Sequence, residues 1–292
     1  MGVALYQGYD AAALEAQYDI EATRADYARV LDGYQMASDH AKGACDGLLD
    51  QAYGDDPLQK LDVYRPNNAL RARRSPVMIY FHGGYWRMGD KAGRAFPAPV
   101  FTKAGAIWVS ANYRLAPDAS MDEIVEDACS AVAWVYRNAL AIGADRERIF
   151  VSGGSAGGHL TGMLLTEGWQ ARHNVPQDTV KGAIAASGLY DLTPFQFTSQ
   201  DGWLGLEAES IQRNSPMFHL PAAGPPLVVS WGGQETSEFE RQSEAYADAY
   251  EQTGAPVIRL PLPDEDHFTL MGQMQHAGSP LTMAMLATMG LR

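Results

Sequence analysis

The segment GGSAGG at residues 153–158 constrains the fold most strongly, and it directly follows the apolar run IFV at 149–151. A serine with glycines two residues before and after it is typical of a sharp turn from a strand into a helix, because only small residues permit such a turn. The turn lifts the serine hydroxyl clear of the backbone. The pattern therefore predicts a nucleophile elbow with Ser155 at its tip.

A strand followed by glycines and a helix can also indicate a phosphate-binding loop. The glycine spacing argues against this alternative. A dinucleotide fingerprint that starts at Gly153 needs a glycine in place of Ser155. A fingerprint that starts one residue later needs a glycine in place of Ala156, and no Gly-Lys-Ser or Gly-Lys-Thr of a Walker loop follows. The segment thus favours acyl transfer, and we expect neither a cofactor nor a metal.

A second motif, FHGGYW at residues 81–86, follows the apolar run VMIY at 77–80. Glycines let the backbone approach a substrate closely, so its amide groups can stabilise the negative charge that develops on a carbonyl oxygen during acyl transfer. The residue after the nucleophile normally adds one more amide. We therefore expect an oxyanion hole formed by the amides of Gly83, Gly84, Tyr85 and Ala156.

The candidate general base is His267, which lies on a loop after the strand-like run VIRL at 257–260. Loops at the carboxyl edge of a parallel sheet carry side chains to the same place, so this histidine can reach the serine. Histidine is also the side chain best suited to accept and return a proton near neutral pH. Other histidines have simpler interpretations. We expect His82 to brace the backbone of the oxyanion loop and His159 to pack beneath the elbow.

Two carboxylates could orient this base, since the expected chain order is nucleophile, acid, histidine. Glu235 follows the apolar run LVVSW at 227–231 and two glycines, which places it at a strand end. It could otherwise serve only to favour the start of the next helix. Asp191, after the run AIAAS at 183–187, is the alternative acid. We favour Glu235, whose role would be to hold the imidazole tautomer and stabilise its charged form.

Composition argues against several other classes of protein. Lys and Arg number 22 against 35 Asp and Glu, which gives a net charge of −13, so nucleic acid and anionic membranes are poor partners. No run approaches the ~18 apolar residues of a membrane span, and the N-terminus lacks a signal-peptide pattern. Cys45 and Cys129 lack metal-ligand spacing, so we expect free thiols. A cytoplasmic location is the resulting expectation.

The order of apolar runs predicts a single domain over residues 1–292. Strand-like runs alternate with helical stretches, which indicates a mainly parallel sheet with helices on both faces. Two segments, 1–55 and 192–221, do not join the alternation, and we expect them to form a small cap over the site. The sequence leaves the oligomeric state open, and a homodimer is compatible with it.

Aromatic residues near these motifs suggest the walls of a substrate pocket. Phe195 and Trp203 lie in the expected cap, and Trp86 follows the oxyanion glycines. Ligand pockets are lined mainly by apolar and aromatic side chains with a few polar groups. We therefore expect these three residues to line a pocket for an apolar acyl or aryl group, and the alternative for Phe195 and Trp203 is a small core within segment 192–221.

Together, these motifs resemble α/β-hydrolases of the esterase and lipase group related to hormone-sensitive lipase. Within that group, the chain is similar to kynurenine formamidases (arylformamidases) and bacterial esterases like them. The resemblance rests on HGGYW at 82–86, GSAGGHL at 154–160, SGLYDL at 187–192, EFERQS at 238–243 and DHF at 266–268. By position, it implies Ser155 as nucleophile, Glu235 as acid and His267 as base. Formamidases usually have aspartate where this chain has Glu235.

The resemblance implies a cofactor-independent serine hydrolase that acts on small esters or aryl formamides through an acyl-enzyme intermediate. The motifs indicate acyl transfer and leave the choice between ester and formamide open, with a slight preference for general esterase activity. A function of another class is a non-catalytic small-molecule receptor or interaction module on the same scaffold, since fold does not fix function. Because Ser155 and His267 are both present, we favour the enzyme.

Overall fold

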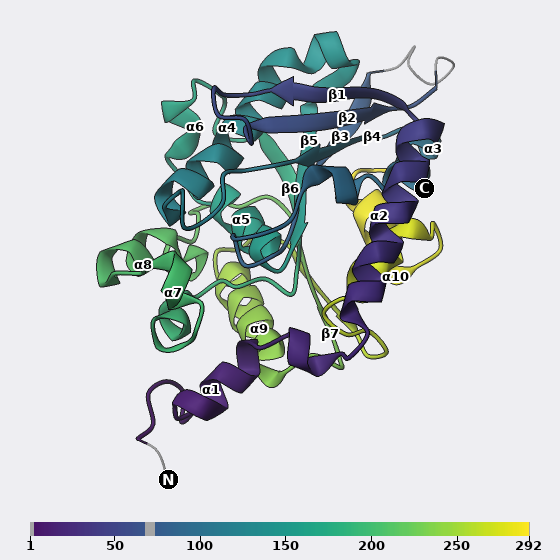
Figure 1. The fold of residues 1–292 in the computed structure, drawn as a ribbon. Coiled ribbons are helices and arrows are strands. Elements are labelled where there is room, and N and C mark those ends of the chain that lie inside the picture. The colour runs from purple at the N-terminus through teal and green to yellow at the C-terminus, as the bar shows by residue number, and fades with distance from the viewer. Residues whose placement is uncertain (1–2, 68–73, 292) are drawn as a thin grey trace.

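An eight-stranded sheet forms the centre of the computed structural model, which describes residues 3–67 and 74–291 (Figure 1). Its strand order is β1-β2-β4-β3-β5-β6-β7-β8. β2 runs antiparallel to β1 and β4, and the other neighbours are parallel. The strands are β1 (Asp46–Ala52), β2 (Lys60–Arg65), β3 (Ser75–Phe81), β4 (Ile107–Ala111), β5 (Ala144–Gly154), β6 (Val180–Ala186), β7 (Leu227–Gly232) and β8 (Val257–Leu262).

The central strand β3 explains why the sheet is covered on both sides. Every residue of β3 is buried. Val77, Ile79 and Phe81 belong to one hydrophobic cluster, and Met78 and Tyr80 belong to the other. A strand with two buried faces has a continuous apolar sequence, and the crossovers between parallel strands place helices on both faces.

Two groups of helices supply these layers (Figure 1). One face is covered by α4 (Met121–Ile142), α5 (Ala156–Leu164) and α9 (Ser237–Glu251), and the other by α2 (Tyr27–Ala44), α3 (Ala98–Lys103) and α10 (Pro280–Thr288). The remaining α-helices are α1 (Ala11–Tyr18), α6 (Trp169–Arg172), α7 (Asp201–Leu204) and α8 (Ala208–Asn214). Short 3₁₀ helices are η1 (Glu21–Thr23), η2 (Lys91–Arg94), η3 (Thr193–Phe197), η4 (Pro216–Phe218) and η5 (Leu270–Gln275). The predicted α/β-hydrolase arrangement is confirmed.

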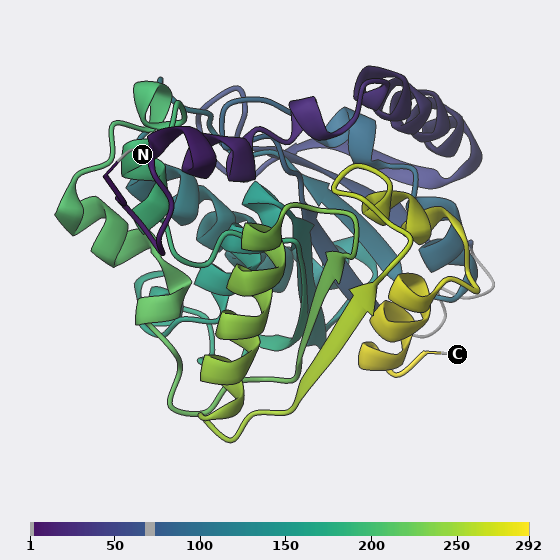
Figure 2. The ribbon, with the colours of Figure 1, turned by 90° about the horizontal axis from the view of Figure 1, so that it is seen from below.

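The two segments expected to form a cap differ in what they become. Residues 192–221 fold into η3, α7, α8 and η4. The N-terminal segment crosses the molecule from the region of α7 and α8 toward α2 (Figure 2). Its last part departs from the expectation over 1–55, because Asp46–Ala52 forms the edge strand β1. This strand is mostly exposed and lacks an apolar alternation, so the sequence carries no clear strand signal there.

Candidate active site

Ser155 lies between the end of β5 and the start of α5, with φ 58° and ψ −123°. An L-residue rarely adopts a positive φ, and such strain persists only where the surroundings enforce it. The surroundings here are backbone atoms. A Cβ on Gly153 would lie 2.3 Å from the carbonyl oxygen of Gly157, and a Cβ on Gly157 would lie 2.0 Å from that of Phe81. The glycines therefore permit the close packing that forces Ser155 into the turn.

The oxyanion loop lies against this turn. A Cβ on Gly83 would be only 3.1 Å from the Cβ of Ser155. Gly84 and Tyr85 both have positive φ, at 118° and 48°. Within the described residues, the amides of Gly83, Gly84, Tyr85 and Ala156 donate no hydrogen bond. Gly83 thus lies against Ser155, and its amide and that of Ala156 are free to donate, as an oxyanion hole requires.

His267 is paired with Glu235 on the other side of the site. Its Nδ1 lies 2.5 Å from Oε1 of Glu235, and both side chains are buried. The second carboxylate oxygen accepts hydrogen bonds from the Ser187 hydroxyl at 2.7 Å and from the Gly232 amide at 2.6 Å. A carboxylate can only accept, so Nδ1 carries the proton and Nε2 is left to accept one. Ser187 is not among the site residues predicted from the sequence, although it stands in the SGLYDL motif directly after β6.

Ser155 and His267 both line one cavity of about 600 Å³. The hydroxyl oxygen of Ser155 is buried and has no hydrogen-bond partner among the described residues. In enzymes without bound substrate, catalytic hydrogen bonds are often long and tighten only when the substrate binds. The arrangement thus brings the two side chains to one cavity without a direct hydrogen bond between them.

The alternative acid, Asp191, is engaged elsewhere. Its carboxylate accepts a hydrogen bond from the Tyr6 hydroxyl at 2.9 Å and another from the Thr193 amide at 2.8 Å. The Arg241 guanidinium in turn donates to the Tyr6 hydroxyl at 3.0 Å. Asp191 therefore anchors the start of the chain, and the carboxylate that contacts His267 is that of Glu235.

Two further histidines support the site from below, as the sequence predicts. Nδ1 of His82 donates to the Gly83 carbonyl at 2.9 Å. His159 accepts a hydrogen bond from the Trp86 indole at 3.2 Å and donates one to the Asn214 carbonyl at 2.6 Å. Burial lowers the pKa of each histidine to about 4. Both rings are consequently neutral near pH 7, and their bracing roles are confirmed.

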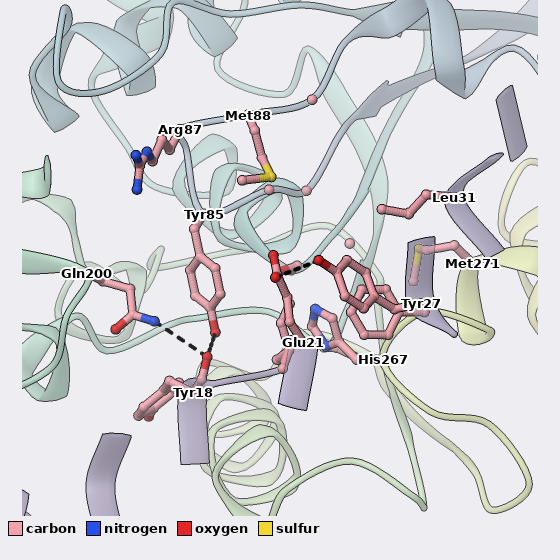
Figure 3. Close-up of a pocket in the computed structure, with 18 of the residues that line it drawn as sticks. Tyr18, Glu21, Tyr27, Leu31, Tyr85, Arg87, Met88, Gln200, His267 and Met271 are labelled. Carbon is pink, nitrogen blue, oxygen red and sulfur yellow. Dashed lines mark hydrogen bonds between the residues drawn. The ribbon is translucent and has the colours of Figure 1, made fainter. Parts of the chain in front are cut away.

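Apolar and polar side chains from several elements line the cavity (Figure 3). Aromatic and aliphatic side chains from α2, β3 and the segment after His267 form its apolar wall: Leu31, Tyr34, Tyr80, Phe268 and Met271. The polar lining residues include Glu21, Arg87 and Gln200. Much of the lining comes from the N-terminal segment, where Leu31 and Tyr34 read in sequence as an ordinary helix face. No signal in the sequence distinguishes them from core residues.

Of the three residues expected in the pocket wall, one lines the cavity and two, Trp86 and Phe195, do not. Trp203 lines the cavity. Trp86 and Phe195 are fully buried instead, and their rings pack edge to face with centroids 5.9 Å apart. The indole N–H of Trp86 is bonded to His159 beneath the oxyanion loop. These large aromatic rings fill the space under the loop. They therefore stabilise the fold and do not face the cavity.

Comparison with known proteins shows the family of the chain. The chain matches the family described as BD-FAE over residues 61–250. The chain belongs to the BD-FAE family. A kynurenine formamidase of Salmo salar is 33% identical over 259 residues, which cover 87% of this chain and 85% of that protein. An esterase of Mycobacterium tuberculosis is 35% identical over 235 residues, which cover 74% of this chain and 58% of that protein.

Solved structures show the same fold. An esterase of Pyrobaculum calidifontis is 20% identical and superposes with a TM-score of 0.71, over 96% of this chain and 97% of that one. With its relatives, this places the BD-FAE protein among hydrolases of the α/β-hydrolase fold. None of the helices in residues 3–67 and 74–291 has the length and apolar character needed to cross a membrane.

Proposed function

We propose that this protein is a serine hydrolase that cleaves small carboxylic esters or aryl formamides through an acyl-enzyme intermediate. One observation carries the proposal: His267, which is paired with the buried Glu235, lines the same cavity as Ser155, which is held in a strained turn. A nucleophile, a base and a group that orients the base are the minimum for this chemistry. Free backbone amides beside Ser155 supply the fourth requirement, a site for the oxyanion.

In the first half-reaction, Oγ of Ser155 attacks the substrate carbonyl carbon while Nε2 of His267 takes the hydroxyl proton. The carbonyl electron pair moves onto oxygen, which the amides of Gly83 and Ala156 stabilise. Glu235 accepts the hydrogen bond from Nδ1 and stabilises the imidazolium that forms. Collapse of the intermediate breaks the bond to the alcohol or aryl amine, which leaves with the proton from Nε2.

The second half-reaction releases the acyl group. Water takes the place of the leaving group, and Nε2 of His267 accepts a proton from it as it attacks the ester carbon of the acylated Ser155. The intermediate then expels the serine oxygen, which regains its proton from the imidazolium. The products are a carboxylic acid, or formic acid from a formamide, and the original enzyme.

The cavity supports a small substrate with an apolar part. Its volume of about 600 Å³ is in the usual range for small-molecule sites, and its apolar wall suits an aryl or short alkyl group. Two relatives are named kynurenine formamidase and esterase, and these names give a formamide and esters as their substrates. We further propose one domain, with the N-terminal segment and residues 192–221 as its cap.

The cellular location and the oligomeric state stay predictions from the sequence. A cytoplasmic location is supported by the two cysteines, Cys45 and Cys129, which are free thiols. A homodimer is compatible with the sequence, and size-exclusion chromatography with light scattering measures it. Neither affects the chemistry proposed for the cavity.

Steady-state rates on three substrates test the proposed function: p-nitrophenyl acetate, a longer p-nitrophenyl acyl ester and N-formylkynurenine. We expect turnover of at least one of these compounds, because a cavity of about 600 Å³ admits a small ester or aryl formamide. Ser155→Ala is the control and should lose this turnover. Folded wild-type protein that binds these compounds without cleaving them would instead favour the receptor.

A further inference from the structure

Residues 17–24, here called the N-terminal strap, run from the end of α1 toward α2 (Figure 2), and Tyr18, Asp19, Ile20 and Glu21 of this segment line the cavity. The strap contacts each of three segments that carry a candidate catalytic group: the oxyanion loop, the segment after Glu235 and the segment before His267. We propose that the strap is a positioning element of the catalytic centre, and that it acts chiefly through the hydroxyl of Tyr85. This inference rests on the proposed function, because it assigns the strap a role in that reaction.

The first contact fixes the oxyanion loop. The hydroxyl of Tyr85 donates a hydrogen bond to the carbonyl of Tyr18 at 2.6 Å (Figure 3). The carbonyl of Tyr85 itself accepts a hydrogen bond from the Trp203 indole at 3.2 Å. Tyr85 is therefore held at its side chain by the strap and at its backbone by α7. Two such restraints favour the unusual backbone conformation of Tyr85, with φ 48°, on which the aim of the loop amides depends.

Tyr18 is a firm anchor for this contact because it is itself fixed. Its side chain is fully buried. Its hydroxyl donates to Glu238 at 2.9 Å and accepts from the side-chain amide of Gln242 at 3.0 Å. Arg241 pairs with the same Glu238 carboxylate at 2.8 Å. The Tyr18 carbonyl that receives the Tyr85 hydroxyl is therefore tied to α9.

The second contact joins the strap to the two residues that follow the candidate acid, Glu235. The carbonyl of Gln17 accepts a hydrogen bond from the Thr236 hydroxyl at 2.5 Å, and its side-chain oxygen accepts one from the Ser237 hydroxyl at 2.9 Å. Thr236 directly follows Glu235 in the chain. The strap thus restrains the backbone from which the Glu235 side chain projects toward His267.

The third contact joins the strap to the base. The guanidinium of Arg24 lies 2.5 Å from the carboxylate of Asp266, which directly precedes His267. Asp266 also accepts hydrogen bonds from the amides of Phe268 and Thr269, at 2.9 and 2.8 Å. The ion pair therefore ties the strap to a tight turn that contains His267. Both side chains are largely shielded, with exposed fractions of 27% and 14%.

These contacts have a common consequence for catalysis. Each one lies at, or one residue away from, a group that must be aligned in the transition state. Active sites need their groups held to within about half an ångström, and this precision depends on the residues that support them. A displacement of about 1 Å can cost on the order of 100-fold in rate. Loss of a strap contact should therefore lower the rate of chemistry more than it lowers substrate binding.

The main test replaces Tyr85 with phenylalanine, which removes one oxygen and leaves the ring. We expect Tyr85→Phe to lower kcat about tenfold and to change KM less than twofold, because indirect loss of alignment should cost less than loss of an oxyanion donor. An aryl trifluoromethyl ketone, which forms an oxyanion with Ser155, should bind about tenfold more weakly. Active sites are counted with a fluorophosphonate, so that kcat refers to intact sites.

A second, matched pair of variants tests the contact with the base. Arg24→Gln should lower kcat about fivefold, by the same loss of alignment. Arg29→Gln is its control, because Arg29 pairs with Asp26 as Arg24 does and lies on α2 away from the cavity. Its kcat should equal that of the wild type.

The outcomes separate a positioning role from a structural one. If Tyr85→Phe and Arg24→Gln lower only the thermal midpoint or the number of titratable sites, with kcat per site and ketone affinity unchanged, the positioning role is wrong. If the wild type neither turns over the substrates nor reacts with the fluorophosphonate, the proposed function fails and the inference with it. Parallel losses in kcat and ketone affinity, with KM and thermal midpoint preserved, support the strap.

Discussion

Ser155 and His267 line one cavity and Glu235 is paired with His267, but the nucleophile and this pair are held in place by different forces. Ser155 is held by backbone packing, in which a Cβ on Gly157 would lie 2.0 Å from a carbonyl oxygen. Glu235 and His267 are held by side-chain hydrogen bonds, including the one from the Ser187 hydroxyl at 2.7 Å. The glycines that permit the turn of Ser155 lie within two residues of it, whereas Glu235, His267 and Ser187 are brought together from separate parts of the chain.

This difference decides what a substitution does. Packing of the backbone leaves no room for added atoms, so a change on the nucleophile side should destabilise the fold. Hydrogen bonds between side chains can be removed one at a time, so a change on the acid and base side should lower the rate and leave the fold intact. Substitutions on each side test whether stability or rate is lost.

The largest effect is expected from His267→Ala. Without a base, the Ser155 hydroxyl keeps its proton, and kcat should fall about 10⁴-fold, or about 5 kcal/mol of barrier. The thermal midpoint should change little, because the ring lies at the wall of a cavity. Steady-state assays with p-nitrophenyl acetate measure the decrease in kcat. A decrease of less than tenfold would mean that another group removes the proton.

Glu235→Gln should follow, with a decrease in kcat of about 10³-fold, because an amide cannot stabilise the imidazolium and favours the wrong tautomer. Asp191→Asn is the matched comparison, since Asp191 anchors Tyr6 away from His267. It should keep kcat within about threefold of the wild type, on the scale of exposed polar contacts. The reverse pattern of losses would make Asp191 the acid.

On the nucleophile side, Gly157→Ala should lower the free energy of unfolding by about 3 kcal/mol, because its added methyl overlaps backbone of β3. Gly33→Ala is the control. A Cβ on Gly33 meets nothing within 4 Å, and alanine is the better helix former, so stability should rise by up to about 1 kcal/mol. Urea unfolding compares both variants with the wild type. Equal stability of Gly157→Ala and the wild type would refute the packing account of the elbow.

The smallest effect concerns the buried histidines beneath the elbow. Burial lowers the pKa of His82 and His159 to about 4, whereas a histidine in an unfolded chain has a pKa of about 6.5. Between these values the unfolded chain binds more protons, so the free energy of unfolding decreases as the pH falls. From pH 7 to pH 5 we expect a loss of about 2 kcal/mol for each histidine.

Urea titrations at the two pH values measure this loss, and His159→Asn provides the comparison. The variant has one buried histidine fewer, so the difference between its stabilities at pH 7 and pH 5 should be about 2 kcal/mol smaller than in the wild type. An equal pH dependence in both proteins would show that His159 is not kept neutral by burial.

Local sequence predicts the parts of the molecule whose geometry is set locally. The elbow, the oxyanion loop and the continuous apolar strands belong to this class, because glycine spacing and apolar runs reflect backbone sterics directly. The edge strand β1 does not, since its residues are mostly exposed. Phe195 shows another limit: its apolar side chain fits a pocket wall or the core equally well, and only the packing places it in the core.

The contacts that support the acid and base mark the same boundary. Nothing near Arg24 in the sequence indicates that it meets Asp266, 242 residues away. Ser187 and Glu235 are likewise 48 residues apart. Such pairs form only after the sheet brings its strand ends together, so they can be seen only in the folded molecule.

Labelling with a fluorophosphonate, followed by mass spectrometry of the peptides, tests the central claim most directly. The reagent phosphonylates a serine only when a base activates it. We expect one adduct per chain, located on Ser155, and a loss of labelling in both Ser155→Ala and His267→Ala. Labelling that persists in folded Ser155→Ala, or that is missing from folded wild type, would contradict the account.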